Sequence, residues 1–269
     1  MTRRLGLLSL IIFAFTIITT GNSLARSLAD ILSSGVLNVG VNPTLQPLGK
    51  YNEKNEITGF DVDFATEVAK ALNVRLNVVV VGSPDRIPFV VSGKIDFVMG
   101  AMTRTPERAK VIDFTVPVHT EVLGVLTTEA VTAKDWKELD NPDVTFVEVR
   151  GSTPVKFIEE NLKKAKMILV DSHPDAVRAV AQGRGTAVLD VIDFLGEHYA
   201  KYPNIKWKIV ETPVDVYYCG LGVAKNSANL KDWLNVFIFD MHRSGKTDAL
   251  WKKWFGIDMI KPVQATPYF

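Results

Sequence analysis

The sequence predicts an α/β protein made of two mixed-sheet lobes joined by a two-stranded hinge. Short β-branched runs alternate with segments of helical periodicity, which is typical of a mostly parallel sheet with helices on both faces. Two long extended apolar runs interrupt this alternation. We therefore expect the chain to cross from the first lobe to the second near 122–128 and to return near 212–218.

The first 25 residues have the order of a secretory signal peptide. Arg3 and Arg4 precede an apolar run over 5–18, and small residues lead up to Ala25. A membrane anchor is the weaker alternative, because the apolar run is shorter than the roughly 20 residues that a spanning helix needs. The sequence thus predicts cleavage after Ala25 and a mature protein in the periplasm.

Composition excludes several classes of function. The 269 residues are 47% hydrophobic and include 31 basic and 30 acidic side chains, a balance that argues against binding to nucleic acid. Cys219 is the single cysteine, so an internal disulfide and a thiolate metal cluster are not expected. Since the sequence has no dinucleotide fingerprint, catalytic elbow or helical metal-ligand motif, we expect neither a cofactor nor a metal.

Strands and helices alternate through both expected lobes. The helix over 61–72 has the clearest signal, because apolar residues recur every four positions from Phe60 to Leu72. The expected strands are 36–41, 76–81, 95–99, 144–149, 167–170 and 187–189, and the further helices are 85–92, 106–111, 154–164, 175–182, 230–243 and 248–255. We assign residues 26–125 and 216–269 to the first lobe, and 126–215 to the second.

Hydroxyl residues followed by proline begin three of these helices, at Ser83, Thr105 and Thr153. Proline suits the first helical position, and serine or threonine caps the free N–H groups. Capping alone would explain each case. In an open α/β sheet, however, such helix ends gather at the carboxyl ends of the strands and can bind an anion. A ligand with a carboxylate or phosphate group is therefore expected.

Arg108 lies in the first turn of the expected helix over 106–111, where its charge opposes the helix dipole. A guanidinium that binds a ligand carboxylate, supported by the Thr103 hydroxyl, would explain this position. The alternative is a surface ion pair with Glu107 or Asp113.

Several segments, taken together, resemble the periplasmic amino-acid-binding proteins of ABC uptake systems, which are bacterial extracellular solute-binding proteins of family 3 with the type II periplasmic binding fold. The resemblance runs in order through essentially the whole mature chain. It implies two hinged lobes that close on an L-amino acid, a monomer without cofactor, and delivery to the membrane subunits of an ABC transporter. The segments that carry it are 59–63, 86–88, 92–97, 103–108, 113–117, 150–153 and 254–256.

The resemblance also implies roles for particular residues. Arg108 and Thr103 match the clamp on the ligand's α-carboxylate, with Ala101 contributing backbone groups. Ser152 and Thr153 match the contacts of the second lobe to the same carboxylate. Asp190 matches the carboxylate that holds the α-ammonium group; a helix N-cap is its alternative role.

The side-chain preference is less directly indicated. Ser83 and Arg86 resemble the glutamate/aspartate-binding branch, in which this arginine lies near the distal carboxylate of the ligand. Asn42 replaces another arginine of that branch, and Leu45 stands where many members have a stacking aromatic. His119 either borders the side-chain pocket or packs at the hinge. A polar or acidic amino acid is therefore expected.

An enzyme is the competing interpretation. Exported cyclohexadienyl dehydratases, which act on prephenate or arogenate, resemble the same family and use an acid one turn beyond the ammonium-binding position. Asp193 has that offset from Asp190 and could act as a general acid if a dry pocket kept it protonated. Its side chain is shorter than the expected glutamate, and a solvated face of a short helix is the simpler explanation.

Overall fold

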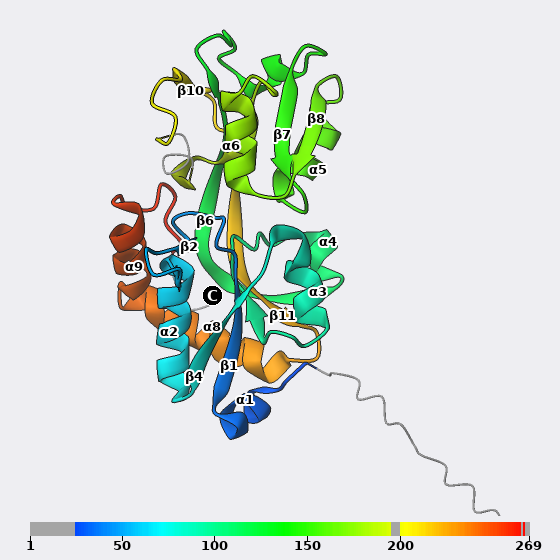
Figure 1. Ribbon diagram of the computed structural model, residues 1–269. Coiled ribbons are helices and arrows are strands. Elements are labelled where there is room, and N and C mark those ends of the chain that lie inside the picture. The colour runs from blue at the N-terminus through cyan, green and yellow to red at the C-terminus, as the bar shows by residue number, and fades with distance from the viewer. Residues whose placement is uncertain (1–24, 195–199, 265, 267–269) are drawn as a thin grey trace, which may run out of the picture.

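The computed structural model describes residues 25–194, 200–264 and 266, which form two α/β lobes (Figure 1). The predicted signal peptide lies outside the described residues except for Ala25. Within the described part of the chain, no helix is both long and apolar enough to cross a membrane. The two-lobed α/β fold that the sequence predicts is confirmed.

The first lobe is built on part of a seven-stranded sheet with the strand order β10-β6-β11-β5-β1-β4, in which β9 also pairs with β6. Strand β1 (Val36–Val41) pairs in parallel with β4 (Arg75–Val80) and β5 (Phe97–Val98). The lobe also contains a small hairpin, β2 (Lys50–Tyr51) with β3 (Ile57–Thr58), and the helices α1 (Leu28–Ser34), α2 (Phe60–Leu72), η1 (Ser83–Asp85), α3 (Arg86–Val91), α4 (Pro106–Ala109), α8 (Ala228–Arg243) and α9 (Lys246–Phe255).

The second lobe is smaller and lies at the top of Figure 1. Strands β7 (Thr145–Val149) and β8 (Lys166–Val170) are parallel, and a bridge between Phe146 and Ala187 connects β7 to the segment that precedes β9 (Val188–Val191). The remaining elements are η2 (Trp136–Leu139), α5 (Thr153–Asn161), α6 (His173–Ala181) and β10 (Trp207–Ile209).

Two long strands, β6 (Ile112–Thr128) and β11 (Asp215–Ala224), connect the lobes. They pair antiparallel from Ile112 to Leu123 of β6, and beyond Leu123 strand β6 pairs with β9 and β10 instead. One continuous strand therefore belongs to both lobes, as expected for a two-stranded hinge. The exact lobe boundaries, at 125/126 and 215/216, stay a prediction.

The structure differs from the sequence prediction mainly in short or polar elements. Helix α1 has a capping box in which Ser27 accepts from Asp30 N, but it is only 7 residues long and its apolar pattern is weak. The expected strand at 122–127 is the end of a 17-residue strand. The first part of this strand contains polar residues, including Thr115, His119 and Glu121, so it lacks the apolar pattern of a buried strand. These residues are nevertheless buried.

The core of the first lobe contains an aromatic cluster around Trp251, which is completely buried. The Trp251 ring stacks on Phe255 with centroids 3.8 Å apart and meets the edge of Phe60 at 5.6 Å. These rings join α9 to α2, so the C-terminal helix is part of the first lobe and not a separate appendage.

We expect Trp251→Ala to lower the free energy of unfolding by about 3–5 kcal/mol, because it removes a large buried ring and leaves a cavity. Urea unfolding of the mature protein measures this change. Val236→Ala is the control, since Val236 lies on α8 with 71% of its surface exposed and its truncation should change stability by less than about 0.5 kcal/mol. Equal effects of the two substitutions would contradict the assignment of Trp251 to the core.

Candidate ligand-binding site

A small pocket of about 30 Å³ lies between the lobes. This is room for about two water molecules, so a larger ligand requires the lobes to part from the arrangement seen here. Both lobes and the hinge contribute to its wall, whose polar side chains include two acids and one arginine. The lining residues are Leu45, Ser83, Arg86, Ala101, Thr103, Glu121, Leu123, Ser152, Thr153, Pro154, His173, Asp190, Val191 and Phe194.

Arg86 is only 4% exposed, and its guanidinium donates to main-chain carbonyl oxygens. Nε donates to Ser83 O at 3.1 Å, and Nη1 donates to Gly100 O at 2.5 Å and Ala101 O at 3.1 Å. Nη2 reaches into the second lobe and donates to Gly151 O at 3.2 Å. Burial and the neighbouring Arg108 lower the pKa of Arg86 to about 9, so the side chain stays charged at neutral pH.

The backbone turn at Gly100 and Ala101 has a left-handed conformation, with φ values of 74° and 55°. A left-handed φ is uncommon for alanine. Asp61 supports the turn from the other side by accepting from Gly100 N at 2.7 Å, while Arg86 binds both carbonyl groups. These two side chains therefore hold Ala101 at the pocket wall.

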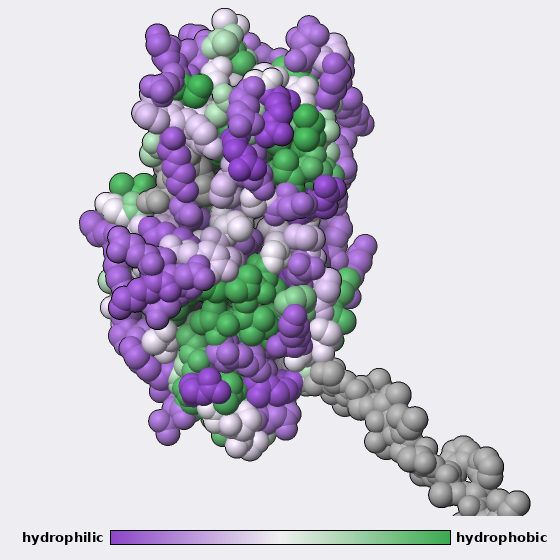
Figure 2. All heavy atoms as spheres, viewed as in Figure 1, coloured by the Kyte–Doolittle hydropathy of each residue, from purple (hydrophilic) through white to green (hydrophobic). Residues whose placement is uncertain are grey.

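Direct contacts between the lobes show that the structure is a closed form. The Thr153 hydroxyl of the second lobe donates to the Thr103 hydroxyl of the first at 3.0 Å. Lys156 and Glu107 form an ion pair at 2.6 Å across the same junction. Figure 2 shows that the lobes touch in this view and that most of the visible surface is hydrophilic.

Arg108 lies beside the pocket and is not one of its lining residues. Its Nη1 donates to Thr103 O at 3.0 Å and its Nη2 to Gly151 O at 3.1 Å, and burial lowers its pKa. The alternative of an ion pair with Glu107 or Asp113 is wrong, because Glu107 pairs with Lys156 and Asp113 pairs with Lys225.

In the second lobe, Asp190 is buried, and its Oδ2 lies 2.8 Å from Nδ1 of His173. Its Oδ1 accepts from Val191 N at 2.8 Å. Ser152 is the N-cap residue of α5, and its hydroxyl oxygen is buried without a hydrogen-bond partner among the described residues. The predicted contacts of the second lobe thus all lie at the pocket.

The predicted residues divide into two groups. Those that the structure brings to the pocket wall are Ser83, Arg86, Ala101, Thr103, Ser152, Thr153 and Asp190. Arg108, Asn42, His119 and Asp193 are not among the lining residues. Asn42 instead donates to the Ser83 hydroxyl at 3.2 Å, and His119 packs against the rings of Phe60 and Trp251.

Sequence reasoning missed Glu121 and His173 as pocket residues. Glu121 is 2% exposed and accepts from the Thr103 hydroxyl at 3.3 Å. An acidic residue inside an otherwise apolar extended run was the available signal for it. His173 follows the cap Ser172 at the start of α6, and only the folded structure brings it to Asp190.

These features define a two-lobed binding protein that closes over a small polar ligand. The chain belongs to the bacterial extracellular solute-binding proteins, family 3, whose family model matches residues 37–257. It is 26% identical over 242 residues to a glutamate/aspartate import solute-binding protein of Escherichia coli, a match that covers 85% of this chain and 79% of the relative.

Two further comparisons connect the chain to a binding protein and to an enzyme. The crystal structure of an ancestral amino acid-binding protein, a precursor of cyclohexadienyl dehydratase, has a TM-score of 0.77 and 30% identity, covering 85% of this chain and 98% of the other. The cyclohexadienyl dehydratase of Pseudomonas aeruginosa is 30% identical over 154 residues, 56% of each chain.

We expect Gly151→Ala to shift the protein towards an open form and to weaken ligand binding severalfold. A Cβ atom at Gly151 would lie 3.0 Å from Pro84 Cα and 3.3 Å from Ser83 O, both in the opposite lobe. Gly183→Ala is the matched control, because Gly183 has nearly the same φ, 71° against 74°, but open space around its Cβ position. Small-angle scattering would measure opening; equal radii of gyration in the two variants would contradict the prediction.

Asp61 should make stability depend on pH. Burial, the largest cause, raises its pKa from 3.8 to about 7, so the folded protein retains a proton that the unfolded chain loses. This contribution to stability is complete below about pH 4 and is lost as the pH rises through 7. Asp61→Asn should therefore reduce the fall in unfolding free energy over that range.

Urea unfolding at several pH values tests this effect of Asp61. Asp258→Asn is the control for the loss of one carboxyl group, since the Asp258 side chain is 83% exposed. The prediction would be wrong if Asp61→Asn and the wild type had parallel pH profiles.

Proposed function

We propose that this protein is an exported binding protein that captures one L-amino acid between its lobes and delivers it to the membrane subunits of an ABC importer. The observation that carries this proposal is the pocket wall, where hydroxyl groups from both lobes lie near Arg86 and Asp190 provides a carboxylate, while Arg108 binds Thr103 O beside it. Cleavage after Ala25, a periplasmic location and a monomeric state belong to the same proposal.

The ligand's α-carboxylate would bind between Thr103 and Thr153, whose hydroxyl groups lie 3.0 Å apart. Arg108 would turn one N–H group from a main-chain oxygen to this carboxylate, forming a charge-assisted hydrogen bond. Asp190 would accept from the α-ammonium group. Because Thr103 belongs to one lobe and Thr153 and Asp190 to the other, the ligand would favour the closed form over the open one.

The surroundings of the pocket favour a neutral polar side chain over an acidic one. All four hydrogen bonds of the Arg86 guanidinium go to main-chain carbonyls, so this group already has partners other than a distal carboxylate. Glu121 adds a second acid to the wall beside Asp190, while Leu45 and Phe194 are apolar. A ligand carboxylate near Glu121 would meet a like charge.

Binding without catalysis is better supported than dehydration. The match to the named dehydratase covers 56% of this chain, whereas the family model spans residues 37–257. Burial raises the pKa of Asp193 to about 6, as a general acid would require. Asp193, however, is not among the residues that line the pocket.

The proposal is tested by measuring the melting temperature of the mature protein with each of the twenty L-amino acids. We expect one or a few neutral polar amino acids to stabilise the mature protein, by about 2.7 kcal/mol when the ligand is present at one hundred times its Kd. Arg108→Ala should abolish this stabilisation. Arg178→Ala is the control and should preserve it, because Arg178 lies on α6 with an exposed side chain. If none of the twenty amino acids stabilised the protein, amino-acid binding would be contradicted. Turnover of prephenate or arogenate would instead support the cyclohexadienyl dehydratase alternative.

A further inference from the structure

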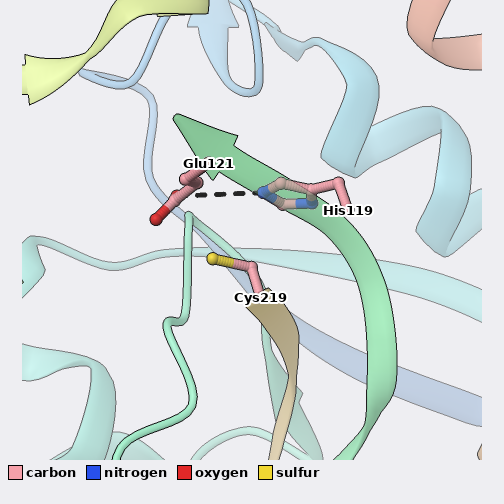
Figure 3. A group of neighbouring side chains, drawn as sticks. All are labelled: His119, Glu121 and Cys219. Carbon is pink, nitrogen blue, oxygen red and sulfur yellow. Dashed lines mark ion pairs between the residues drawn. The ribbon is translucent and has the colours of Figure 1, made fainter. Parts of the chain in front are cut away.

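Three buried side chains form a cluster at the hinge, and one of them, Glu121, also lines the ligand pocket (Figure 3). They are His119, Glu121 and Cys219, and one potential ligand atom from each lies within 4.8 Å of the other two. Their exposed fractions are 3%, 2% and 1%. The sequence predicts no metal here, because no histidine has metal-ligand spacing on a helix and Cys219 is the single cysteine.

The pairing of β6 with β11 places these side chains on one face of the hinge. Residues two apart on a strand point to the same side, which puts His119 and Glu121 together. Cys219 is the direct cross-strand partner of His119. Directly paired residues have Cβ atoms about 4.5–5.5 Å apart, so the three side chains converge without any rearrangement of the strands.

The cluster contains polar atoms that lack hydrogen-bond partners among the described residues. These atoms are Nδ1 and Nε2 of His119 and Oε1 of Glu121. Nε2 and Oε1 face one another at 3.8 Å, too far apart for a hydrogen bond. Buried polar atoms are seldom left without a partner in native proteins, and an ion between them is one common reason.

We propose that His119, Glu121 and Cys219 bind a divalent cation of the zinc type. Imidazole, carboxylate and thiolate are all zinc ligands, at about 2.0–2.3 Å, and tetrahedral bonds of this length separate the nitrogen and oxygen by roughly 3.4 Å. The observed 3.8 Å separation therefore needs only a small contraction.

Charge balance also suits such an ion. On binding, Cys219 releases its proton to solvent, and the charges of thiolate, carboxylate and Zn²⁺ sum to zero. A neutral site avoids the cost of a net charge in a buried environment.

The fourth position of the ion would face the ligand pocket. Glu121 lines that pocket, and the Thr103 hydroxyl lies 3.3 Å from Glu121 Oε2 and 3.9 Å from Cys219 Sγ. Three protein ligands with one open position are typical of zinc sites that also hold water or another small molecule. The cleft between the lobes provides the route by which the ion enters.

The test uses the reduced mature chain, stripped of metal with a chelator and titrated with Zn²⁺ or Co²⁺ alone. We expect one equivalent to bind, and the Co²⁺ form to show a thiolate-to-metal charge-transfer band together with the intense visible bands of a tetrahedral site. Cys219→Ser should remove the charge-transfer band, and His119→Gln and Glu121→Gln should each weaken binding at least tenfold. His242→Gln, which replaces a histidine that contacts the Pro117 carbonyl, should bind like the wild type.

X-ray absorption of the zinc-loaded wild type keeps the test independent of whether the variants fold. It should show one sulfur at about 2.3 Å and nitrogen or oxygen ligands at about 2.0–2.2 Å. The absence of stoichiometric binding, or a zinc shell without sulfur, would overturn the proposal. Because no amino acid is present, either result leaves the amino-acid-binding proposal to be judged separately.

Discussion

The binding site depends on one buried cation, the Arg86 guanidinium. A charge removed from water is costly unless dipoles or counter-charges replace its hydration. Here the main-chain carbonyls of Ser83, Gly100, Ala101 and Gly151 do so. Three of these carbonyls belong to the first lobe and one to the second. The same group that shapes the pocket wall therefore also favours closure of the lobes.

Closure is held by a small number of polar contacts, and a ligand must use or replace them. Gly151 accepts from both arginines, and the Thr103 and Thr153 hydroxyls bond directly to each other. Such bonds contribute about 1 kcal/mol each, or somewhat more when a charge takes part. A ligand that makes better contacts with both lobes in the closed form than these bonds do would therefore shift the equilibrium towards closure.

The sequence predicted the two-lobed fold because that fold rests on local periodicity and on two long extended runs. It also predicted that hydroxyl residues lie at helix starts, where serine and threonine are common. Ser152 is the N-cap residue of α5 and Thr153 its first residue, although the Ser152 side chain makes no capping hydrogen bond. The sequence did not predict Glu121 or His173, whose importance comes from contacts with Thr103 and Asp190 that are distant in sequence. The backbone carbonyls that Arg86 contacts leave no pattern in the sequence either, and its expected place near a distal carboxylate of the ligand stays a prediction.

Strand β6 explains why the ligand pocket and the proposed cation site are neighbours. It is the hinge, so it must be continuous with both sheets, and its pairing changes from β11 to β9 and β10 at Leu123. Just before this change, His119 and Glu121 lie two residues apart and are both buried, and of the two only Glu121 lines the pocket. Strand pairing holds Cys219 directly opposite His119, and Thr103 is bridged to Cys219, so these groups belong to one paired segment of the hinge. Because Glu121 also lines the ligand pocket, an ion bound there would lie beside the ligand.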